Sequence, residues 1–540
     1  MPKVKRVAVI GGGVSGLLSL KSCLECGLEP VCFERGDKAG GVWATPEMDS
    51  FDDYNGGSIY KCLITNSSKE MMAISDFPFP KEFPPYLTPK HLITYYRDFI
   101  KHNGLEKRIR LATEVVEVTP SEDHEATGRW VVTSRPRDQN EGVGVTVEVF
   151  DAVIVSTGLY NEAFIPRYPG MDEFKGKIVH SCKFKSGEQF AGKTVLVVGS
   201  SHSAGDVAVD TSRHASQVYL SMRDGSWVVG RFGPKGVPTD SFVNRRWRGM
   251  VPEAVTRKIA KSIIEDRFDI DNLGMRCKRE LFNGYLMVND EIHCRIVCGA
   301  IKCKPGIERF TPGGVVFEDG TRVEGLDAVV FATGYDFKFP FFKEKIIGES
   351  VEDSELYMHV WPARRTHPTL AAVGYLATSG AQSPVFELQS RWAAQVFLGN
   401  VQLPDVEERL TDVKRRKDMF FEKFGRHRIF YTPVPYSDEI AEKIGAKPNF
   451  TKLLLTDPKL ALRCFFGPAY PPNYRLNGPY PWKGAREAIM NGWENTTYPT
   501  KTRTVAKPSK SSALTLFGGA GRLMGVIFAV VLLSLLLVIV

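Results

Sequence analysis

Two apolar runs near the start of the chain have the spacing of a strand, a turn and a helix. Residues 6–10 form a short run of mostly branched apolar residues, which predicts a buried strand. A glycine cluster follows directly, and Leu17, Leu18 and Leu20 then recur with the spacing of a helix face. A second apolar run, at residues 30–34, ends in an acidic side chain. The pattern predicts strand, glycine turn, helix and strand, in that order.

The same pattern occurs again in the middle of the chain. An apolar run at residues 194–198 precedes a glycine-containing turn at 199–206, and residues 217–223 predict the next strand. Each copy closes with a buried strand that ends in Thr-Gly, at residues 150–158 and at residues 326–334. Small residues in such turns let the backbone approach a ligand. We therefore predict an α/β fold with two Rossmann-like dinucleotide-binding domains.

The rest of the chain is divided by Pro and Gly breaks and has weaker periodicity. We predict the first part of one domain at residues 1–165 and the second domain at 166–335, with a mostly helical insertion at about 230–300. Residues 336–495 are expected to complete the first domain. The other expected elements are helices at residues 94–109, 386–397 and 412–424 and strands at residues 115–118 and 130–133.

The chain ends in 18 residues, 523–540, without a charged side chain. About 20 apolar residues span a bilayer, and a buried terminal helix would keep a polar face that this segment lacks. Four basic residues between positions 503 and 522 precede it, as expected of a cytosolic flank. We predict a C-terminal transmembrane helix at 523–540, joined by a tether at 496–522. The N-terminus runs straight into the first strand, so we expect no signal peptide.

Composition narrows the classes of function. The chain has 540 residues and a formal net charge of +8, but its basic residues are dispersed among acidic ones, so we expect no nucleic-acid partner. Ten cysteines are ordinary usage for this length and predict neither a disulfide framework nor a metal site. Cys23 and Cys26 have CxxC spacing, but they fall on the helix expected after the first turn. There we expect packing and not redox chemistry.

The first turn has the GxGxxG spacing of a dinucleotide-binding site. Gly11 allows the tight turn, Gly13 allows close approach of the pyrophosphate, and Gly16 allows the helix to pack on the strand. The phosphates then lie at the helix N-terminus. Glu34, at the end of the next strand, would accept hydrogen bonds from ribose hydroxyls and would repel a 2′-phosphate. This site therefore suits FAD or NAD and not NADP.

The second turn departs from that spacing. Ser201 stands where the second glycine is expected, and its side chain is a modest steric objection to a pyrophosphate. Ser203, Gly205 and Asp206 still open the predicted helix.

The strand after the second turn lacks an acidic residue at its end. Ser221 and Arg223 occupy that place. A guanidinium forms charge-assisted, two-pronged hydrogen bonds with phosphate, so this site predicts NADPH. Asp224, next to Arg223, would weaken the local positive field.

Five short motifs lie outside the apolar runs. Residues 174–184 fit the pattern FxGxxxHxxx followed by an aromatic side chain, Phe184. The other motifs are GGVW at residues 40–43, NSSKEMM at 66–72, ATGY at 332–335 and ELQSRW at 387–392. With the two glycine turns and the apolar tail, they make the chain resemble the flavin-containing monooxygenases of animals over nearly its whole length.

The resemblance implies a reaction cycle that uses FAD, NADPH and O2. NADPH reduces FAD, O2 adds at flavin C4a, and the hydroperoxide persists while NADP+ stays bound. It transfers one oxygen atom to a soft nucleophilic nitrogen or sulfur of a small amine or sulfide, giving an N-oxide or S-oxide. The cofactor carries this chemistry, and the protein supplies placement and a dry cavity. The resemblance also implies the endoplasmic reticulum membrane, with catalytic domains facing the cytosol. Whether the chain forms a homo-oligomer is left open.

Asn66 matches the family's active-site asparagine, so we expect it to be the catalytic residue. Its amide is implied to lie near flavin and nicotinamide and to help protect the hydroperoxide. His180 is implied to be structural, at the joint between the domains. Ala377 replaces an amide-bearing residue of many relatives, so the substrate surroundings can differ. The residues expected to bind the two cofactors are Gly11, Gly12, Gly13, Val14, Ser15, Gly16, Glu34, Gly41, Val42, Trp43, Thr65, Asn66, Ser67, Gly199, Ser203, Ala204, Gly205, Asp206, Ser221, Arg223, Thr333 and Gly334.

Four other functions share parts of this pattern. A Baeyer–Villiger monooxygenase inserts oxygen into a ketone, but its signature usually ends in tryptophan where this chain has Phe184. An NADPH oxidase would release hydrogen peroxide without oxygenating a substrate. A disulfide reductase would need a reactive CxxC facing the flavin, and Cys23 and Cys26 lie on the wrong element. A tail-anchored, NADP-sensing scaffold would take up no O2 with NADPH.

Overall fold

The computed structural model describes residues 4–44, 56–138, 144–336, 338–348, 353–425 and 429–503. Contacts group residues 1–498 into one compact unit and residues 499–540 into a second. The α-helices and β-strands named below all lie in the first unit.

The first glycine turn lies on a five-stranded parallel sheet with the strand order β22-β7-β1-β2-β3. The predicted first two strands are confirmed, and helix α1 (Val14–Glu25) connects them. Strands of a parallel sheet covered on both faces are continuous apolar runs, and most side chains of β1 and β7 are buried. The strands are β1 (Arg6–Ile10), β2 (Glu29–Phe33), β3 (Ile109–Arg110), β7 (Ala152–Val155) and β22 (Leu370–Ala372).

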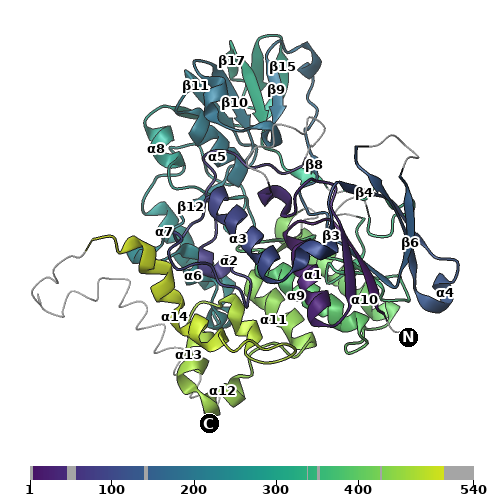
Figure 1. Ribbon diagram of the computed structural model, residues 1–540. Helices are drawn as coiled ribbons and strands as arrows, with labels where there is room; N and C mark the ends of the chain where they lie inside the picture. Colours follow the sequence, from purple (N-terminus) through teal and green to yellow (C-terminus); the bar gives the residue numbers. More distant parts are fainter. Residues whose placement is uncertain are drawn as a thin grey trace, which may run out of the picture. The chain divides into compact units, whose positions relative to one another are not determined.

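The second glycine turn lies on another five-stranded parallel sheet, with the order β14-β11-β10-β18-β9. This sheet is at the top of the view in Figure 1. Helix α5 (His202–Thr211) follows the turn, as predicted. Val195, Leu196 and Val197 are fully buried, which explains the unbroken apolar run at residues 194–198. The strands are β9 (Lys177–His180), β10 (Thr194–Val198), β11 (Gln217–Ser221), β14 (Ile301–Lys304) and β18 (Ala328–Phe331).

Helix α9 (Ser383–Phe397) packs along α1 and carries the ELQSRW motif. The predicted helix is confirmed and begins three residues earlier, with Pro384 in its first turn. Its side chains are almost all buried. The Ser390 hydroxyl lies 3.1 Å from that of Ser19 on α1, and Glu387 pairs with the buried Arg475 at 3.0 Å. The motif therefore packs against α1, the helix that begins at the first glycine turn.

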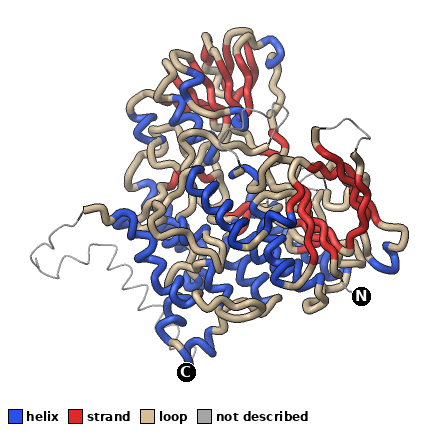
Figure 2. The backbone as a smooth tube through the Cα atoms, in the orientation of Figure 1, coloured by secondary structure: helices blue, strands red, loops and turns tan. Residues whose placement is uncertain are grey.

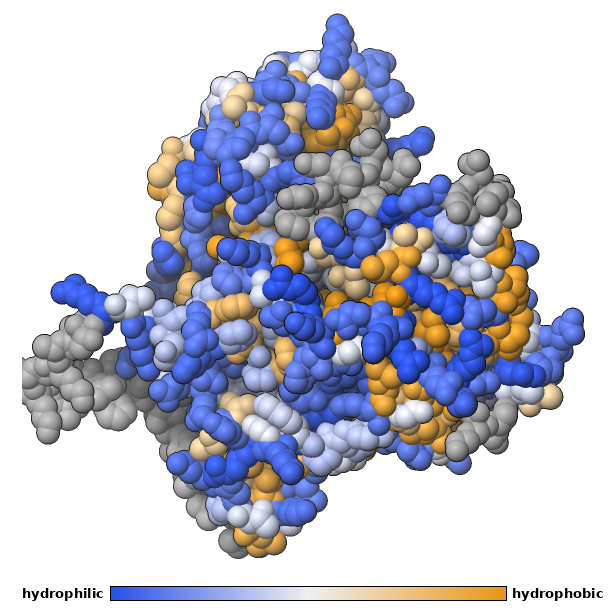
Figure 3. Space-filling model, in the orientation of Figure 1, coloured by the Kyte–Doolittle hydropathy of each residue, from blue (hydrophilic) through white to orange (hydrophobic). Residues whose placement is uncertain are grey.

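Two smaller antiparallel sheets flank the parallel ones. The strands expected at residues 115–118 and 130–133 are longer than predicted, and a third strand extends their sheet. Val147 and Val149 on that third strand are exposed, and Figure 3 shows apolar side chains over this sheet at the right of the molecule. The first sheet contains β4 (Thr113–Pro120), β5 (Trp130–Pro136) and β6 (Thr146–Phe150), and the second contains β15 (Ile307–Thr311), β16 (Gly314–Phe317) and β17 (Arg322–Glu324).

The insertion at about 230–300 is less helical than predicted. Its one long helix, α7 (Glu253–Glu265), has 13 residues, and the other two are short. A two-stranded parallel sheet, β12-β13, connects the insertion to the second five-stranded sheet and its helix, because β13 packs on α5. The remaining elements are α6 (Thr239–Val243), α8 (Ile292–Val297), β12 (Trp227–Val229) and β13 (Leu286–Val288).

Most of the other helices lie in the lower part of the view in Figure 2, where blue segments predominate, whereas the short α4 lies at the right beside β6. The helix expected at residues 94–109 begins and ends earlier, because Thr88 caps its start and left-handed Gly104 stops it. The helix expected at 412–424 begins six residues earlier, at an Asp405 cap. These helices are α2 (Lys69–Met72), α3 (Pro89–His102), α4 (His124–Thr127), α10 (Val406–Phe424), α11 (Pro433–Lys443), α12 (Phe450–Thr456), α13 (Pro458–Phe466) and α14 (Ala485–Thr497).

Short strand pairs complete the fold. They are β8 (Glu162–Ala163) with β19 (Tyr335–Asp336), β20 (Leu356–Tyr357) with β21 (Trp361–Pro362), and β23 (Ala377–Thr378) with β24 (Phe430–Tyr431).

The predicted transmembrane helix at residues 523–540 lies outside the described residues, as does the tether after residue 503. Within the described ranges, no helix has the length and hydropathy needed to cross a membrane. The first two tether residues, 496 and 497, belong to α14.

Candidate functional site

The first glycine turn joins β1 to α1 with two glycines that accept no side chain. Gly11 has φ +100°, and its N–H donates to the Phe33 carbonyl at 2.9 Å. A Cβ on Gly16 would lie 1.9 Å from the carbonyl oxygen of Gly11. Helix α1 therefore packs against the turn as closely as the backbone allows, which is the role predicted for these residues.

The first cradle is formed by the backbone of Gly13 and Gly41, which come close together at this turn. Gly13 faces Gly41, and a Cβ on Gly41 would come within 2.9 Å of the Gly13 Cα. Gly13 is also the N-cap residue of α1, where no described side chain caps the first N–H groups. Free N–H groups at a helix start bind anions, so backbone from two segments surrounds the place where a pyrophosphate would lie. Val42 and Trp43 follow in a short 3-10 turn and are partly exposed.

Glu34 ends β2 beside this cradle. One carboxylate oxygen accepts the Gly12 N–H at 2.7 Å, and the other accepts the Gly36 N–H at 2.6 Å. Burial raises the pKa of Glu34 above its ordinary value, although these two backbone hydrogen bonds act in the opposite direction. Each oxygen keeps a second lone pair for a ribose hydroxyl. The residues present therefore fit the adenosine half of FAD.

At the second turn, the start of the helix packs against the insertion and not against the backbone of the turn itself. Gly199 has φ +151°, and a Cβ there would lie 2.4 Å from the Ala332 carbonyl oxygen. A Cβ on Gly205 would instead meet Met287 Sδ, on β13, at 2.6 Å. Ser201 occupies the N-cap position of α5, but its hydroxyl does not cap the helix and donates to the Leu286 carbonyl, also on β13, at 3.1 Å. The departure from glycine at position 201 thus serves a contact with the insertion.

The first turn of α5 is open to a phosphate in the same way as that of α1. It carries no acidic side chain, and within the described chain no side chain caps it. Ser203 is exposed and Ala204 is buried. These features fit a second dinucleotide, as predicted.

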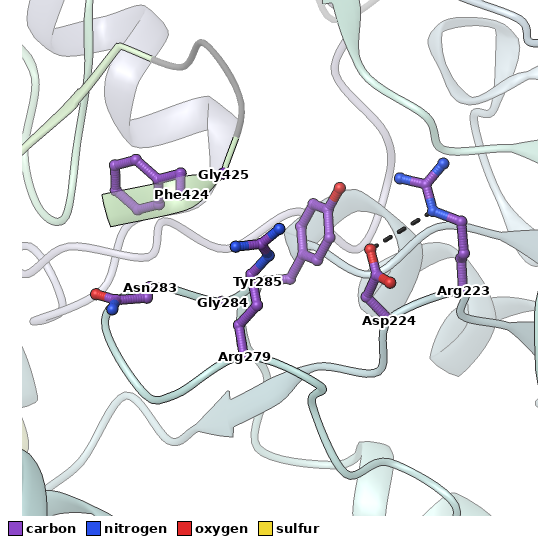
Figure 4. Close-up of a pocket in the computed structure, with 8 residues that line it drawn as sticks. All are labelled: Arg223, Asp224, Arg279, Asn283, Gly284, Tyr285, Phe424 and Gly425. Carbon is purple, nitrogen blue, oxygen red and sulfur yellow. Dashed lines mark ion pairs between the residues drawn. The ribbon is translucent and has the colours of Figure 1, made fainter. Parts of the chain in front are cut away.

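A pocket of about 190 Å³ lies beyond β11 and contains Arg223. Figure 4 shows the Arg223 side chain next to Asp224, with the Tyr285 ring and then Arg279 across the pocket. Arg223 Nε lies 3.5 Å from an Asp224 oxygen, and 66% of the Arg223 side chain is exposed. Lys278 pairs with the other Asp224 oxygen at 3.7 Å. The pocket presents two guanidinium groups, of which the sequence pattern predicted one.

Ser221 does not line this pocket. Its hydroxyl donates to the Pro305 carbonyl at 2.7 Å, and the residue is 2% exposed. The structure therefore brings Arg223, but not the predicted Ser221 hydroxyl, to the place where a 2′-phosphate would be recognised.

Asn66 lies in a segment that the insertion holds. Arg231 Nη2 donates to Asn66 Oδ1 at 2.9 Å, and Arg231 Nε donates to the Thr65 carbonyl at 3.0 Å. The Asp240 carboxylate accepts both the N–H and the hydroxyl of Ser68, at 2.7 and 3.1 Å. Asn66 itself stays partly exposed. The contacts that hold this segment are thus long-range, and no local sequence pattern indicates Arg231.

The residues on either side of Asn66 are turned inward. Thr65 is 7% and Ser67 is 8% exposed. The Thr65 hydroxyl accepts the Leu87 N–H at 2.9 Å and donates to the Ser67 carbonyl at 3.0 Å. In this structure Thr65 and Ser67 fix the loop, and Asn66 is the side chain that the loop presents.

The Asp206 carboxylate, on α5, connects the segment around Tyr60 to the insertion. The Tyr60 hydroxyl donates to Asp206 Oδ2 at 2.5 Å, and Asn289 Nδ2 donates to Asp206 Oδ1 at 2.9 Å. Burial raises the pKa of Asp206 above its ordinary value, although the Tyr60 hydrogen bond acts in the opposite direction. Both oxygens of this predicted cofactor residue therefore already have protein partners.

His180 has both ring nitrogens engaged. Nδ1 accepts the Cys182 N–H at 3.2 Å, so Nε2 carries the proton that it donates to the Gly334 carbonyl at 3.0 Å. Burial lowers the pKa of His180, which favours the neutral ring. The neighbouring Thr333 hydroxyl donates to the Phe164 carbonyl at 2.5 Å. His180 thus fixes the turn after β18, in agreement with a structural role.

The CxxC pair does not form a redox site. Cys23 is fully buried on α1 and Cys26 is its C-cap residue, at the end of the helix opposite the glycine turn. Burial raises the pKa of both thiols, which disfavours the reactive thiolate. The expectation of packing is confirmed.

Comparison with known proteins agrees with this geometry. The sequence profile of the family described as flavin-binding monooxygenase-like matches residues 4–540. Flavin-containing monooxygenase 5 of Cavia porcellus is 40% identical over 539 residues, 98% of this chain and 99% of that protein. Dimethylaniline monooxygenase [N-oxide-forming] 2 of Macaca mulatta is 39% identical over 514 residues, 94% of this chain and 95% of that protein.

Solved structures share the fold. The S-allyl-L-cysteine S-oxygenase of Allium sativum superposes with a TM-score of 0.63 at 24% identity, over 92% of this chain and 99% of that chain. A cyclohexanone monooxygenase bound to ε-caprolactone superposes with a TM-score of 0.59 at 19% identity, over 81% of this chain and 97% of that chain. With two dinucleotide cradles in one fold and full-length relatives near 40% identity, the chain belongs to the flavin-containing monooxygenase family and is an enzyme that uses FAD and NADPH.

Proposed function

We propose that this enzyme uses NADPH and O2 to oxygenate soft nucleophilic nitrogen or sulfur atoms of small molecules, giving N-oxides and S-oxides. The observation that carries the proposal is Asn66, whose amide oxygen is bound by Arg231 while its amide nitrogen is left to donate. The relative named as an N-oxide-forming dimethylaniline monooxygenase supports the nitrogen branch.

Bound FAD would supply the reduction and oxygen-transfer chemistry. In this proposal the protein's own residues bind, orient and exclude water. The backbone of residues 11–16 and Gly41 holds the flavin pyrophosphate, and Glu34 accepts from its ribose. Arg223 binds the 2′-phosphate of NADPH. Asn66 donates a hydrogen bond toward the reacting centre from a loop whose neighbours are shielded from water.

Substitution of Asn66 tests this role. Asn66→Ala removes the amide, and Asn66→Asp keeps the contact with Arg231 but replaces the donor by an acceptor. Both variants should bind FAD and accept electrons from NADPH. Loss of one hydrogen bond to a charge-bearing reaction centre costs about 1.5–3 kcal/mol, so product formation should fall about tenfold to a hundredfold.

The assay measures NADPH consumed, hydrogen peroxide released and product formed, with a tertiary amine and with a thioether. In the variants, peroxide per NADPH should rise as product falls. If Asn66→Asp keeps the coupling of the parent enzyme, the amide does not protect oxygen transfer and its assignment fails.

Baeyer–Villiger oxygenation of ketones is the second candidate. The support for this candidate is the shared fold with a protein named cyclohexanone monooxygenase. The same assay with a cyclic ketone separates the two functions. Lactone formed faster than sulfoxide or N-oxide would replace the proposal, and peroxide as the main product with every substrate would indicate an NADPH oxidase.

We further propose that residues 523–540 anchor the protein in the endoplasmic reticulum membrane, with the catalytic domains in the cytosol. The support is the uncharged apolar segment and the basic residues before it. Deletion of residues 523–540 should release an active, FAD-loaded protein from washed membranes. A truncated protein that stays in the pellet at high salt and in carbonate would contradict a single anchor.

A further inference from the structure

We propose that Arg231 is a positioning residue that fixes the Asn66 amide as a hydrogen-bond donor toward the bound cofactors. The inference rests on the proposed function of Asn66. Arg231 lies just after β12, and Asn66 precedes α2, so the contact joins the insertion to the cofactor-facing loop.

The guanidinium reaches three groups of that loop. Nη2 donates to Asn66 Oδ1 at 2.9 Å and to the Ile64 carbonyl at 3.2 Å, and Nε donates to the Thr65 carbonyl at 3.0 Å. Nη1 pairs with Asp290 Oδ2 at 3.0 Å. Arginine has five N–H donors in one plane, and four contacts at these atoms define its orientation.

The backbone of Arg231 is fixed as well. Its N–H donates to Asp290 Oδ1 at 2.9 Å. Its carbonyl accepts the Thr239 N–H at 2.9 Å and the Tyr86 hydroxyl. The residue is 8% exposed. Because both the backbone and the guanidinium of Arg231 have partners, the residue can restrict the orientation of the Asn66 amide more than a solvated arginine could.

The chemistry of the contact decides which way the amide faces. A guanidinium has only donors, so the Asn66 atom beside it must be the oxygen. Nδ2 therefore points away from Arg231, and a flip of the amide would place two donors against each other. Among the described residues, none accepts a hydrogen bond from Nδ2. Asn66 is thereby a donor of fixed direction, where an unrestrained amide would donate or accept.

Asp290, whose side chain is 38% exposed, is the carboxylate that pairs directly with Arg231, and the buried Asp206 also lies near enough for its pKa to be lowered by the guanidinium. Asp290 neutralises Arg231, so the positive charge is not what the cofactors meet. Arg231 is therefore expected to act by orienting the Asn66 amide and not by its own charge.

A double-mutant cycle tests this in the FAD-loaded enzyme with Arg231→Gln, Asn66→Ala and the pair. Coupling is read as peroxide per NADPH, and NADP+ binding is read from the visible spectral change of bound FAD. Arg231→Gln should uncouple the enzyme to nearly the extent of Asn66→Ala. It should also raise the Kd for NADP+ about threefold to tenfold, the range expected for one hydrogen bond. In the Asn66→Ala background, Arg231→Gln should change neither quantity by more than about twofold, since independent sites would instead add.

Arg246→Gln is the matched control. The Arg246 side chain is 5% exposed, against 9% for Arg231; it pairs with Asp438 at 3.0 Å and donates to an asparagine oxygen, Asn473 Oδ1, at 2.8 Å. Its loss should lower the melting temperature as Arg231→Gln does, but should leave coupling and NADP+ binding as in the parent. Arg231→Lys, which keeps the charge but not the planar fork, should retain the melting temperature better than Arg231→Gln and still uncouple. It also replaces Arg231→Gln if that variant does not fold.

Two results overturn the inference. Losses that add fully in the pair show that Arg231 acts independently of Asn66, and a lowered melting temperature with unchanged coupling shows a structural role alone. Full coupling in Asn66→Ala is a different failure, because it removes the proposed function of Asn66 itself.

Discussion

The two dinucleotide units share strand, turn, helix and strand, but they close their turns differently. In the first unit, Gly16 packs on the backbone of Gly11, so the packing of the helix on its turn lies within six consecutive residues. In the second unit, Gly205 packs on Met287, and Ser201 donates to Leu286, both from the insertion. A local motif therefore specifies the first site, whereas the second site needs a strand that lies about 80 residues further along the chain.

The strand after each turn also ends differently. Glu34 is fixed by two backbone N–H groups and leaves lone pairs for ribose. Arg223 extends into a pocket with Arg279 and Tyr285. The acidic end suits an adenosine without a 2′-phosphate, and the basic end suits one with it. The five substitutions below separate the contributions of the turns and of the strand ends.

The largest effect is expected from Gly16→Ala compared with Gly205→Ala. A methyl group at position 16 meets a backbone oxygen at 1.9 Å, which cannot move without separating α1 from the turn. Overpacking of this kind costs up to about 3 kcal/mol, so FAD affinity should fall about a hundredfold.

At position 205 the methyl group meets a flexible methionine at 2.6 Å, so NADPH affinity should fall only about fivefold. Flavin absorbance per protein and the KM for NADPH measure the two effects. Equal losses of both cofactors would show that the two turns are equally constrained.

Arg223→Ala should have the next largest effect. A charge-assisted phosphate contact contributes about 1.5–3 kcal/mol, and the exposure of this side chain places it at the lower end, about tenfold in the KM for NADPH. The KM for NADH should be unchanged. A matching loss with NADH would mean that Arg223 supports the fold.

Asp224→Asn should act in the opposite direction. The carboxylate is shared by Arg223 and Lys278, and its removal frees both cations for phosphate. Exposed pairs contribute about 0.2–1 kcal/mol, so the KM for NADPH should fall by up to about fivefold. A raised KM would instead indicate that Asp224 holds Arg223 in place. NADH serves as the control coenzyme.

The smallest effect is expected from Ser201→Gly, which restores the glycine of the first turn's pattern. The Ser201 hydroxyl is bound to Leu286, so its loss should change the KM for NADPH by less than about twofold. The lost hydrogen bond should still destabilise the protein by about 1 kcal/mol, visible in thermal unfolding. A large gain in NADPH affinity would show that the serine side chain obstructs the coenzyme.

The elements closest to each cradle were predictable because they follow local rules. Unbroken aliphatic runs form β1 and β10, and glycine spacing locates both turns. The helix starts were less predictable, since α9 and α10 begin earlier than their apolar periodicity indicates. Their first turns are specified by Pro384 and by the Asp405 cap.

Long-range contacts account for what the sequence did not predict. Nothing near Arg231 indicates that it reaches Asn66, 165 residues earlier in the chain. The Ser221 hydroxyl was expected at the pocket, but it bonds to the Pro305 carbonyl after β14. The insertion has a weak apolar pattern because much of its structure is loop, held by single hydrogen bonds such as that from Asn289 to Asp206.

The place of β22 in the first sheet has a consequence for synthesis of the protein. The second sheet needs only strands between residues 177 and 331, whereas β7 waits for its neighbour at residues 370–372. At typical translation rates the 215 residues from the end of β7 to the start of β22 take roughly 10–40 s to synthesise, and during that time β7 is an open sheet edge on the nascent chain. We expect the later of the two nucleotide units to finish folding first, so that a ribosome stalled just before residue 370 would carry a completed NADPH unit beside an FAD unit that still lacks an edge strand.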